Sequence, residues 1–167
     1  NYAENKFEEV LELDIFNAAA WLNIGTLYYT TERYSEALEA FNNSLYIDSS
    51  TAIIHYSIGL VLEKLGSIPQ AIQAYQQAIF LDSQWIDAYN QLGKILCIMG
   101  NFNAAESVYI KAISTNPKHF NSYLNLGNVL LEQERIDEAI VAYEQALQLN
   151  LVIRTFSIIL GLHLKLR

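Results

Sequence analysis

The chain has 167 residues, of which 52% are hydrophobic and 17% charged, and this composition excludes an intrinsically disordered protein. The formal net charge of −8 is carried by residues 1–83, where three Lys and Arg stand against eleven Asp and Glu (3 − 11 = −8). A chain of this sign repels a phosphate backbone, so we expect no nucleic acid partner. The acidic side chains either attract a basic or mixed-charge protein surface or simply solvate the outward faces of the protein.

Neither a secretory signal nor a membrane span is expected. Residues 1–17 carry charges throughout and lack the apolar run of a signal peptide. The most apolar stretch, 151–164, contains Arg154 and His163 and is shorter than the about 20 residues that span a bilayer. Cys97 is the only cysteine of the sequence, so no disulfide can form within it, which fits a reducing compartment. We therefore predict a soluble, cytoplasmic protein.

The seven glycines of the sequence recur with a period of 34 residues. A fixed period of this kind is the signature of a repeat architecture, whose units stack on their neighbours. The glycines form one series of five and one of two: Gly25, Gly59, Gly93, Gly127 and Gly161, then Gly66 and Gly100. We predict a single array over 1–167 with four full repeats and two half repeats: 1–17 (half), 18–51, 52–85, 86–119, 120–153 and 154–167 (half).

Each full repeat is predicted to hold two helices. Counted from the first residue of the repeat, positions 4, 7, 8 and 11 form the i, i+3, i+4, i+7 stripe of an amphipathic first helix. We expect the glycine at position 8 to let the two helix backbones approach closely, with an aromatic side chain at position 24 filling the gap. This close packing must offset a cost of roughly 1 kcal/mol for glycine in a helix interior. Positions 20, 24 and 27 form the facing small–large–small stripe, which reads Ala37-Phe41-Ser44, Ala71-Tyr75-Ala78, Ala105-Tyr109-Ala112 and Ala139-Tyr143-Ala146.

Capping and turn residues separate the predicted helices. Ser35, Ser67 and Asn101 are predicted N-caps of the second helices. Pro69 falls near a first helical position, where its missing amide proton is harmless. Polar residues also separate successive repeats, and Asn150 is the weakest of these breaks.

This pattern resembles the tetratricopeptide repeat (TPR), whose 34 residues carry an aromatic, Leu-Gly, Tyr, Ala, aromatic, Ala and Pro at set positions. The resemblance covers essentially the whole chain, and the third and fourth repeats match at nearly every position. The departures are His55 for the first aromatic, Ser44 for the second alanine, and Ser49, Ser83 and Leu151 for the proline. The resemblance implies an all-α, right-handed superhelical solenoid of antiparallel helix pairs.

The two ends of the chain fit the same register. Residues 2–14 correspond to a second helix without its first, and residues 154–167 to a first helix without its second. Neither end has the polar surface of a capping repeat, which solenoids need for solubility. The chain is therefore either a fragment of a longer array or a module whose open ends associate head to tail into a homo-oligomer. The apolar residues expected at such contacts are Phe7, Phe156, Ile159, Leu160 and Leu164.

No group of residues in the sequence predicts catalysis. His55, His119 and His163 fall in different units, so they do not form the cluster that a metal or catalytic site requires. Cys97 has no base nearby in its own helix, and the isolated glycines form no phosphate-binding loop. We therefore expect no enzyme, no metal and no cofactor.

In TPR proteins the first helices line the concave face, and the resemblance implies that a partner protein or peptide binds there. Position 6 carries Asn23, Ser57, Gln91 and Asn125, a row similar to the asparagine ladder in the TPR region of O-linked N-acetylglucosamine transferase. Such amides bind the backbone of an extended peptide, or they are ordinary polar residues of a wet face. The apolar neighbours favour an amphipathic helix or an apolar peptide as the ligand. The expected partner-binding residues are Asn23, Thr26, Tyr29, Tyr56, Ser57, Leu60, Asn90, Gln91, Lys94, Asn121, Leu124, Asn125 and Asn128.

Three functions are compatible with these features. The first is a protein–protein interaction scaffold with a peptide-binding groove. The second is a substrate-docking TPR segment of a larger enzyme, for example a glycosyltransferase. The third is a self-associating structural module held by its uncapped ends.

Overall fold

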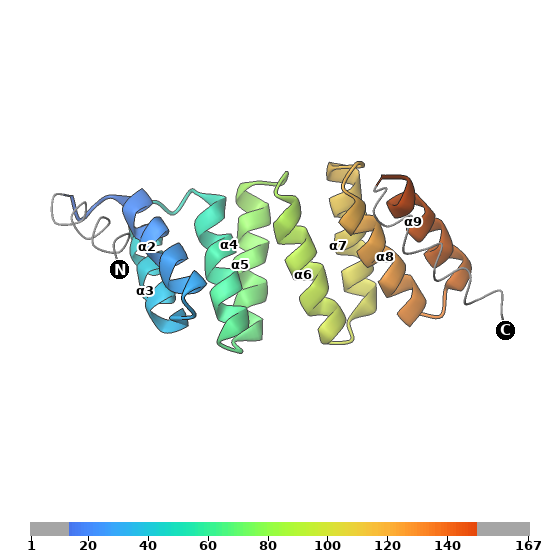
Figure 1. The fold of residues 1–167 in the computed structure, drawn as a ribbon, viewed down its shortest axis with the longest axis horizontal. Helices are drawn as coiled ribbons and strands as arrows, with labels where there is room; N and C mark the ends of the chain where they lie inside the picture. The colour runs from blue at the N-terminus through green and yellow to red at the C-terminus, as the bar shows by residue number, and fades with distance from the viewer. Residues whose placement is uncertain (1–13, 150–167) are drawn as a thin grey trace. The chain divides into compact units, whose positions relative to one another are not determined.

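The computed structural model describes residues 14–149, and every regular element in this range is an α-helix (Figure 1). A 13-residue first helix alternates with a 14-residue second helix throughout. None of the helices among the described residues is both long and apolar enough to span a bilayer. The helices are α2 (Ala18–Thr30), α3 (Tyr34–Ile47), α4 (Ala52–Lys64), α5 (Ile68–Leu81), α6 (Ile86–Ile98), α7 (Phe102–Thr115), α8 (Phe120–Glu132) and α9 (Ile136–Leu149).

The helix boundaries repeat with the period of the glycines. First helices begin at residues 18, 52, 86 and 120, and second helices at 34, 68, 102 and 136, so each series advances by 34 residues. The all-α fold of consecutive helix pairs predicted from the sequence is confirmed. The residues predicted as half repeats, 1–17 and 154–167, lie outside the described residues apart from 14–17.

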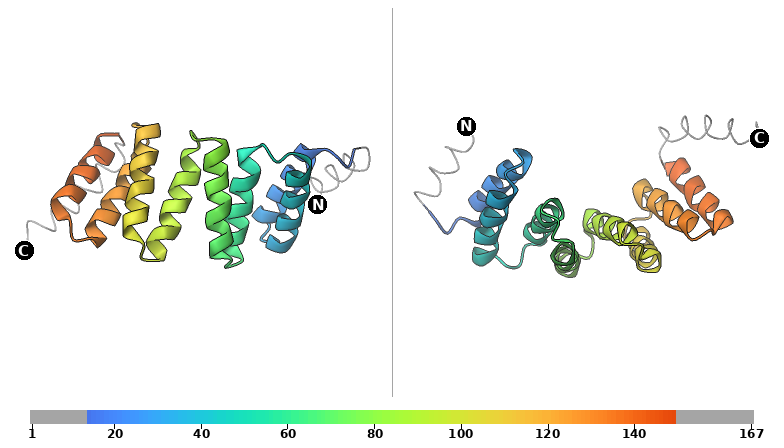
Figure 2. Two further views of the ribbon diagram at one scale, coloured as in Figure 1. Left: turned by 180° about the vertical axis from the view of Figure 1, so that it is seen from behind. Right: turned by 90° about the horizontal axis from the view of Figure 1, so that it is seen from below.

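The chain divides into two compact units, residues 1–88 and 89–167, which we describe separately. In the first unit, α2 packs on α3, α3 on α4 and α4 on α5, and α2 also touches α4. In the second unit, α7 packs on α8 and α8 on α9 (Figure 2). Within each unit these helices contact their neighbours in sequence, which is how repeat proteins bury their apolar surface.

Glycine and an aromatic ring form the contact inside every helix pair. A Cβ atom placed on Gly93 would lie only 2.5 Å from the Cζ atom of Tyr109, closer than any real side chain approaches. The alanines that flank the ring, Ala105 and Ala112, are fully buried. The close approach predicted from the two stripes is therefore confirmed. The same contact joins Gly25 to Phe41, Gly59 to Tyr75, and Gly127 to Tyr143.

Ser44 shows how one departure from the family pattern is accommodated. It replaces the alanine of the other repeats and is fully buried. Its Oγ donates a hydrogen bond of 2.8 Å to the backbone carbonyl of Ala18 at the start of α2. Because a buried hydroxyl is costly only when it lacks a partner, the serine is tolerated here.

The turns inside the helix pairs use left-handed backbone at one position of each repeat. Glycine occupies this position twice, with φ of 75° at Gly66 and 74° at Gly100. Glutamate occupies it in the other two repeats, with φ of 61° at both Glu32 and Glu134. Such a conformation is strained for a residue with a side chain.

The predicted N-caps were correct in part. Asn101 caps α7, and its side chain accepts a hydrogen bond from the backbone of Ala104 at 3.3 Å. Ser67 occupies the N-cap of α5 but forms no capping bond with its side chain. The prediction for Ser35 was wrong, because α3 begins one residue earlier and its N-cap is Arg33.

Candidate functional site

The surroundings of the histidines and the cysteine in the described part of the chain indicate structural roles. Burial lowers the pKa of the half-buried His55, which lies at position 4 of its repeat on α4. Burial also raises the pKa of the Cys97 thiol, which keeps it protonated at neutral pH. Residues 14–149 contain no group of three or more His, Cys, Asp and Glu side chains that could hold a metal ion. His163 lies outside this range.

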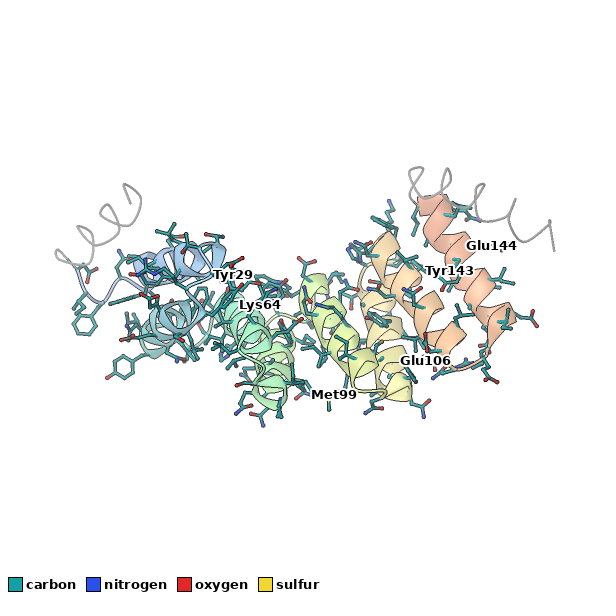
Figure 3. All side chains as sticks on the ribbon, turned by 60° about the horizontal axis from the view of Figure 1, so that its bottom comes forward. Tyr29, Lys64, Met99, Glu106, Tyr143 and Glu144 are labelled. Carbon is teal, nitrogen blue, oxygen red and sulfur yellow. The ribbon has the colours of Figure 1, made fainter. Side chains whose placement is uncertain are left out.

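The predicted binding residues of the first unit lie on α2 and α4, and all are exposed or half-buried. Thr26 donates a hydrogen bond of 2.8 Å to the Leu22 carbonyl of its own helix. The Tyr29 ring, labelled in Figure 3, lies 5.7 Å from the ring of Tyr34 on α3. The Tyr56 ring packs between those of Tyr75 and Trp85, at 5.8 Å and 5.6 Å. These aromatic side chains therefore support the packing of the unit as well as forming part of its surface.

The second unit brings two of the predicted residues into direct contact. The side-chain amide of Asn125 on α8 donates to the Asn90 Oδ1 on α6 at 3.3 Å. The same Oδ1 accepts a hydrogen bond of 3.3 Å from the Oγ of Ser122, which lies 2.9 Å from His119 Nδ1. The first helices α6 and α8 are thus linked side by side, and the Asn125 Oδ1 is left as an acceptor at the surface.

Ser122 belongs to this hydrogen-bonded group but is not among the residues predicted from the sequence. It is fully buried, and its Oγ donates a hydrogen bond to Asn90 Oδ1. The corresponding position 3 of the other repeats is occupied by Ala20, Ile54 and Ala88, all of them buried. A polar residue at a position that is apolar in every other repeat is the signal that could have revealed it.

Two tyrosines of the second helices form hydrogen bonds with polar side chains of the first helices. The hydroxyl of Tyr143 on α9 donates to Asn128 Oδ1 at 2.8 Å. The hydroxyl of Tyr75 on α5 donates to a carboxylate oxygen of Glu63 at 3.2 Å. Burial and then the charge of Glu63 raise the pKa of Tyr75 far above its ordinary value, so its proton stays in place. From the sequence, a packing role alone is predicted for these tyrosines.

A pocket of about 380 Å³ opens on the second unit between α6, α7 and α8. Its walls are mainly apolar, with one amide and one carboxylate at the surface. We call it the Cys97 pocket, and its lining consists of Cys97, Ile98, Phe102, Asn128, Val129 and Glu132.

A second hollow of the same unit, about 320 Å³, lies between α7, α8 and α9. It is bordered by Arg135, which forms an ion pair of 2.7 Å with Glu106 on α7 and another of 2.7 Å with Glu138 on α9. Arg135 also donates to Gln133 at 2.9 Å. This network ties α7 to the α8–α9 turn, so we assign it a structural role.

The predicted residues of the second unit, like those of the first, are exposed or half-buried on the first helices. Asn90 and Asn125 are brought together, and the Asn128 amide is held by Tyr143. Phe7, Phe156, Ile159, Leu160 and Leu164, predicted for self-association, lie outside the described residues.

The repeated helix pairs, with their glycine–aromatic contacts, agree with the result of a family comparison. A family model of the tetratricopeptide repeat matches residues 16–81 and 86–151. The chain belongs to the TPR family. No curated protein sequence matches it significantly.

Several solved structures share this fold. One structure of MamA is 27% identical over 87% of this chain and 85% of that chain, with a TM-score of 0.81. YrrB, described as a TPR protein with an unusual peptide-binding site, is 26% identical over 88% of this chain and 76% of that chain, with a TM-score of 0.73. PilF of Pseudomonas aeruginosa, at 20% identity over 86% of this chain and 66% of that chain and a TM-score of 0.77, shows likeness of fold alone.

Proposed function

We propose that this TPR chain is a non-enzymatic protein-interaction module whose first helices bind a peptide. The hydrogen-bonded amides of Asn90 and Asn125 carry the proposal. Because each amide is held by its neighbour, and Asn90 also by Ser122, little side-chain entropy is lost when a ligand binds. The surface acceptor Oδ1 of Asn125 matches a backbone N–H group of an extended peptide.

The neighbouring residues support a peptide as the ligand. Leu124 is half-buried beside Asn125 on α8 and offers apolar contact, while Asn121 and Asn128 are exposed amides on the same helix. An extended backbone needs hydrogen-bond partners along its length, and side-chain amides supply both donors and acceptors. The resemblance of YrrB, whose description names a peptide-binding site, favours the same ligand class. We extend the proposal to Asn23 and Ser57 of the first unit, which occupy position 6 as Asn125 does.

A displayed peptide library tests the proposal. Peptides selected on the wild-type chain are measured against Asn90→Ala/Asn125→Ala, and we expect Kd to rise about tenfold for the loss of the hydrogen bond to Asn125 and of the Asn90 contact that orients it. Gln148→Ala, which removes an exposed amide from α9, is the matched control and leaves Kd unchanged. Selected peptides that bind the double variant as tightly as the wild type would contradict the proposal.

A second candidate function, self-association, is favoured by the apolar surface of α9. Ile136, Ile140 and Leu149 are 58%, 49% and 39% exposed. The residues at the same positions of α3, α5 and α7 are all half-buried. The face of α9 is therefore of the kind that the following first helix covers on α3 and on α7, where α4 and α8 pack, and a second copy of the chain can supply such a helix. The residues equivalent to Ile136 are Tyr34, Ile68 and Phe102. Those equivalent to Ile140 are Leu38, Ile72 and Glu106, and those equivalent to Leu149 are Ile47, Leu81 and Thr115.

Light scattering over a range of protein concentrations tests this candidate. We expect the mass of the wild-type chain to rise with concentration and Ile136→Lys/Ile140→Lys to remain monomeric, because the added charges oppose burial of the face. Gln148→Lys, a charge added at an already polar position of α9, is the control. A wild-type mass that stays monomeric at high concentration would exclude self-association.

A further inference from the structure

The Cys97 pocket differs in chemistry from the corresponding place in the first unit. The residues 68 positions earlier in the sequence, two repeats back, are Tyr29 for Cys97, Leu60 for Asn128 and Lys64 for Glu132. In the first unit the Tyr29 ring packs at 5.7 Å from that of Tyr34, whereas a small thiol stands in its place in the second. Tyr29 and Lys64 are both labelled in Figure 3. A thiol is smaller than a phenol ring, so it occupies less space at this position in the second unit.

The pocket has an apolar interior and one acidic group. Val129 is buried at its base, and the exposed Ile98 and half-buried Phe102 form apolar walls. Glu132 carries the only charge of the lining. Within the part of the chain that the structure describes, its carboxylate has no ion-pair partner. A charged ligand group of opposite sign would supply one.

The polar edge of the pocket is held in place from α9. The hydroxyl of Tyr143 donates to Asn128 Oδ1 at 2.8 Å, which sets the orientation of that amide. Glu132 lies four residues after Asn128 on α8, so the two side chains share one face of the helix, and both line the pocket. The carboxylate and the amide oxygen therefore lie along one edge of the pocket, and both are acceptors.

We propose that the Cys97 pocket binds the basic side chain of a lysine or arginine in the bound peptide. The aliphatic stem of such a residue packs on apolar surface while its cationic head stays at the water boundary. Ile98, Phe102 and Val129 supply the surface for the stem, and Glu132 with Asn128 Oδ1 supplies acceptors for the head. The proposal rests on the proposed peptide-binding function, but the preference of the pocket is measurable without a peptide.

Three small probes with the same six-carbon chain test the preference: n-hexylammonium chloride, n-hexanol and sodium hexanoate. Titrations of the isotope-labelled chain are followed by the amide NMR signals of Cys97, Ile98 and Val129. At low ionic strength we expect hexylammonium to bind about threefold more tightly than hexanol, because an exposed ion pair contributes modestly. Hexanoate is expected to bind more weakly than either.

Two variants assign the effect to the pocket. Glu132→Gln keeps the shape but removes the charge, so the affinities for hexylammonium and hexanol become equal. Cys97→Tyr introduces the side chain found at the same position of the first repeat and abolishes binding of both probes. Should Cys97→Tyr fail to fold, Glu132→Gln at its exposed position still decides the question.

The outcomes separate this inference from the proposed function. Equal affinity of the wild-type chain for the ammonium and the alcohol, or signal changes outside the pocket, overturns the basic side-chain preference. Selected peptides without lysine or arginine that depend on Asn90 and Asn125 overturn it as well, while leaving the peptide-binding proposal standing. Probe binding as described, with no peptide selected from the library, supports the pocket and contradicts the peptide-binding function.

Discussion

Gly93 of α6 and Tyr109 of α7 are in such close contact that any larger residue at position 93 would displace the tyrosine ring. A Cβ atom on Gly93 would lie 2.5 Å from Cζ of the tyrosine ring. The ring itself is buried, and its pKa is raised far above the ordinary value by burial and by Cys97 beside it. The contact joins the two helices of one repeat, and its equivalents recur in the other three.

Gly93→Val is expected to lower the free energy of unfolding by about 3 kcal/mol, because the added methyl groups force the Tyr109 ring out of place. Denaturant unfolding followed by circular dichroism measures the change. Leu131→Val, at an exposed position of α8, controls for the helix cost of a β-branched residue. A Gly93→Val variant as stable as this control would disprove the steric relationship.

Glu32→Gly is expected to stabilise the chain by about 1 kcal/mol, because glycine adopts the left-handed backbone without strain. The exchange in the other direction, Gly66→Ala, should destabilise by a similar amount. No atom lies within 4 Å of a Cβ placed on Gly66, so the effect reports backbone conformation rather than a clash. Thermal or denaturant unfolding of both variants is the measurement, and changes of the same sign would refute the explanation.

The stability of the chain should depend on pH through His55. Burial lowers the pKa of its imidazole below the ordinary value of 6.5. The unfolded chain then binds the proton more readily than the folded chain, so stability is present above about pH 6.5 and falls as the pH drops below it. Tyrosine occupies the equivalent position of the third and fourth repeats, as Tyr89 and Tyr123. His55→Tyr therefore removes the pH-dependent contribution to stability. The stability difference between variant and wild type should grow from pH 7 to pH 5, and a difference independent of pH would contradict the assignment.

Arg135 and Glu106 should be energetically coupled across two repeats. Their 2.7 Å ion pair connects α7 with the α8–α9 turn, and Arg135 also pairs with Glu138. A double-mutant cycle of Arg135→Met and Glu106→Gln is expected to give a favourable coupling that shrinks in 1 M salt. The pair Arg33 and Glu36, which spans only three residues of one turn, is the control for a purely local interaction. Independent effects of the two substitutions would show that the pair adds nothing to the packing.

The repeat period and the glycine–aromatic contact could be predicted from the sequence because both depend on residue spacing within one repeat. The Gly93–Tyr109 contact was predicted from the glycine at position 8 and the aromatic residue at position 24, which small residues flank. The bonds from Asn90 to Asn125 and from Tyr143 to Asn128 could not be predicted in the same way. They depend on side-chain rotamers and on how neighbouring first helices pack, which spacing does not determine.

The start of α3 shows a second limit. Ser35 has a typical capping side chain, yet the helix begins one residue before it. Arg33, at the N-cap, stacks 4.1 Å from the centre of the Tyr28 ring and pairs with Glu36. These contacts of the arginine stabilise the N-terminus of α3 one residue before Ser35, and they outweigh the capping preference of the serine.

The central claim is that the first helices bind a peptide, and NMR mapping of a library-selected peptide tests it most directly. We predict saturable changes in the amide signals of Gln91, Leu124 and Asn125 on α6 and α8, which are lost in Asn90→Ala/Asn125→Ala. Signal changes confined to the second helices α7 and α9, and retained in that variant, would contradict the claim.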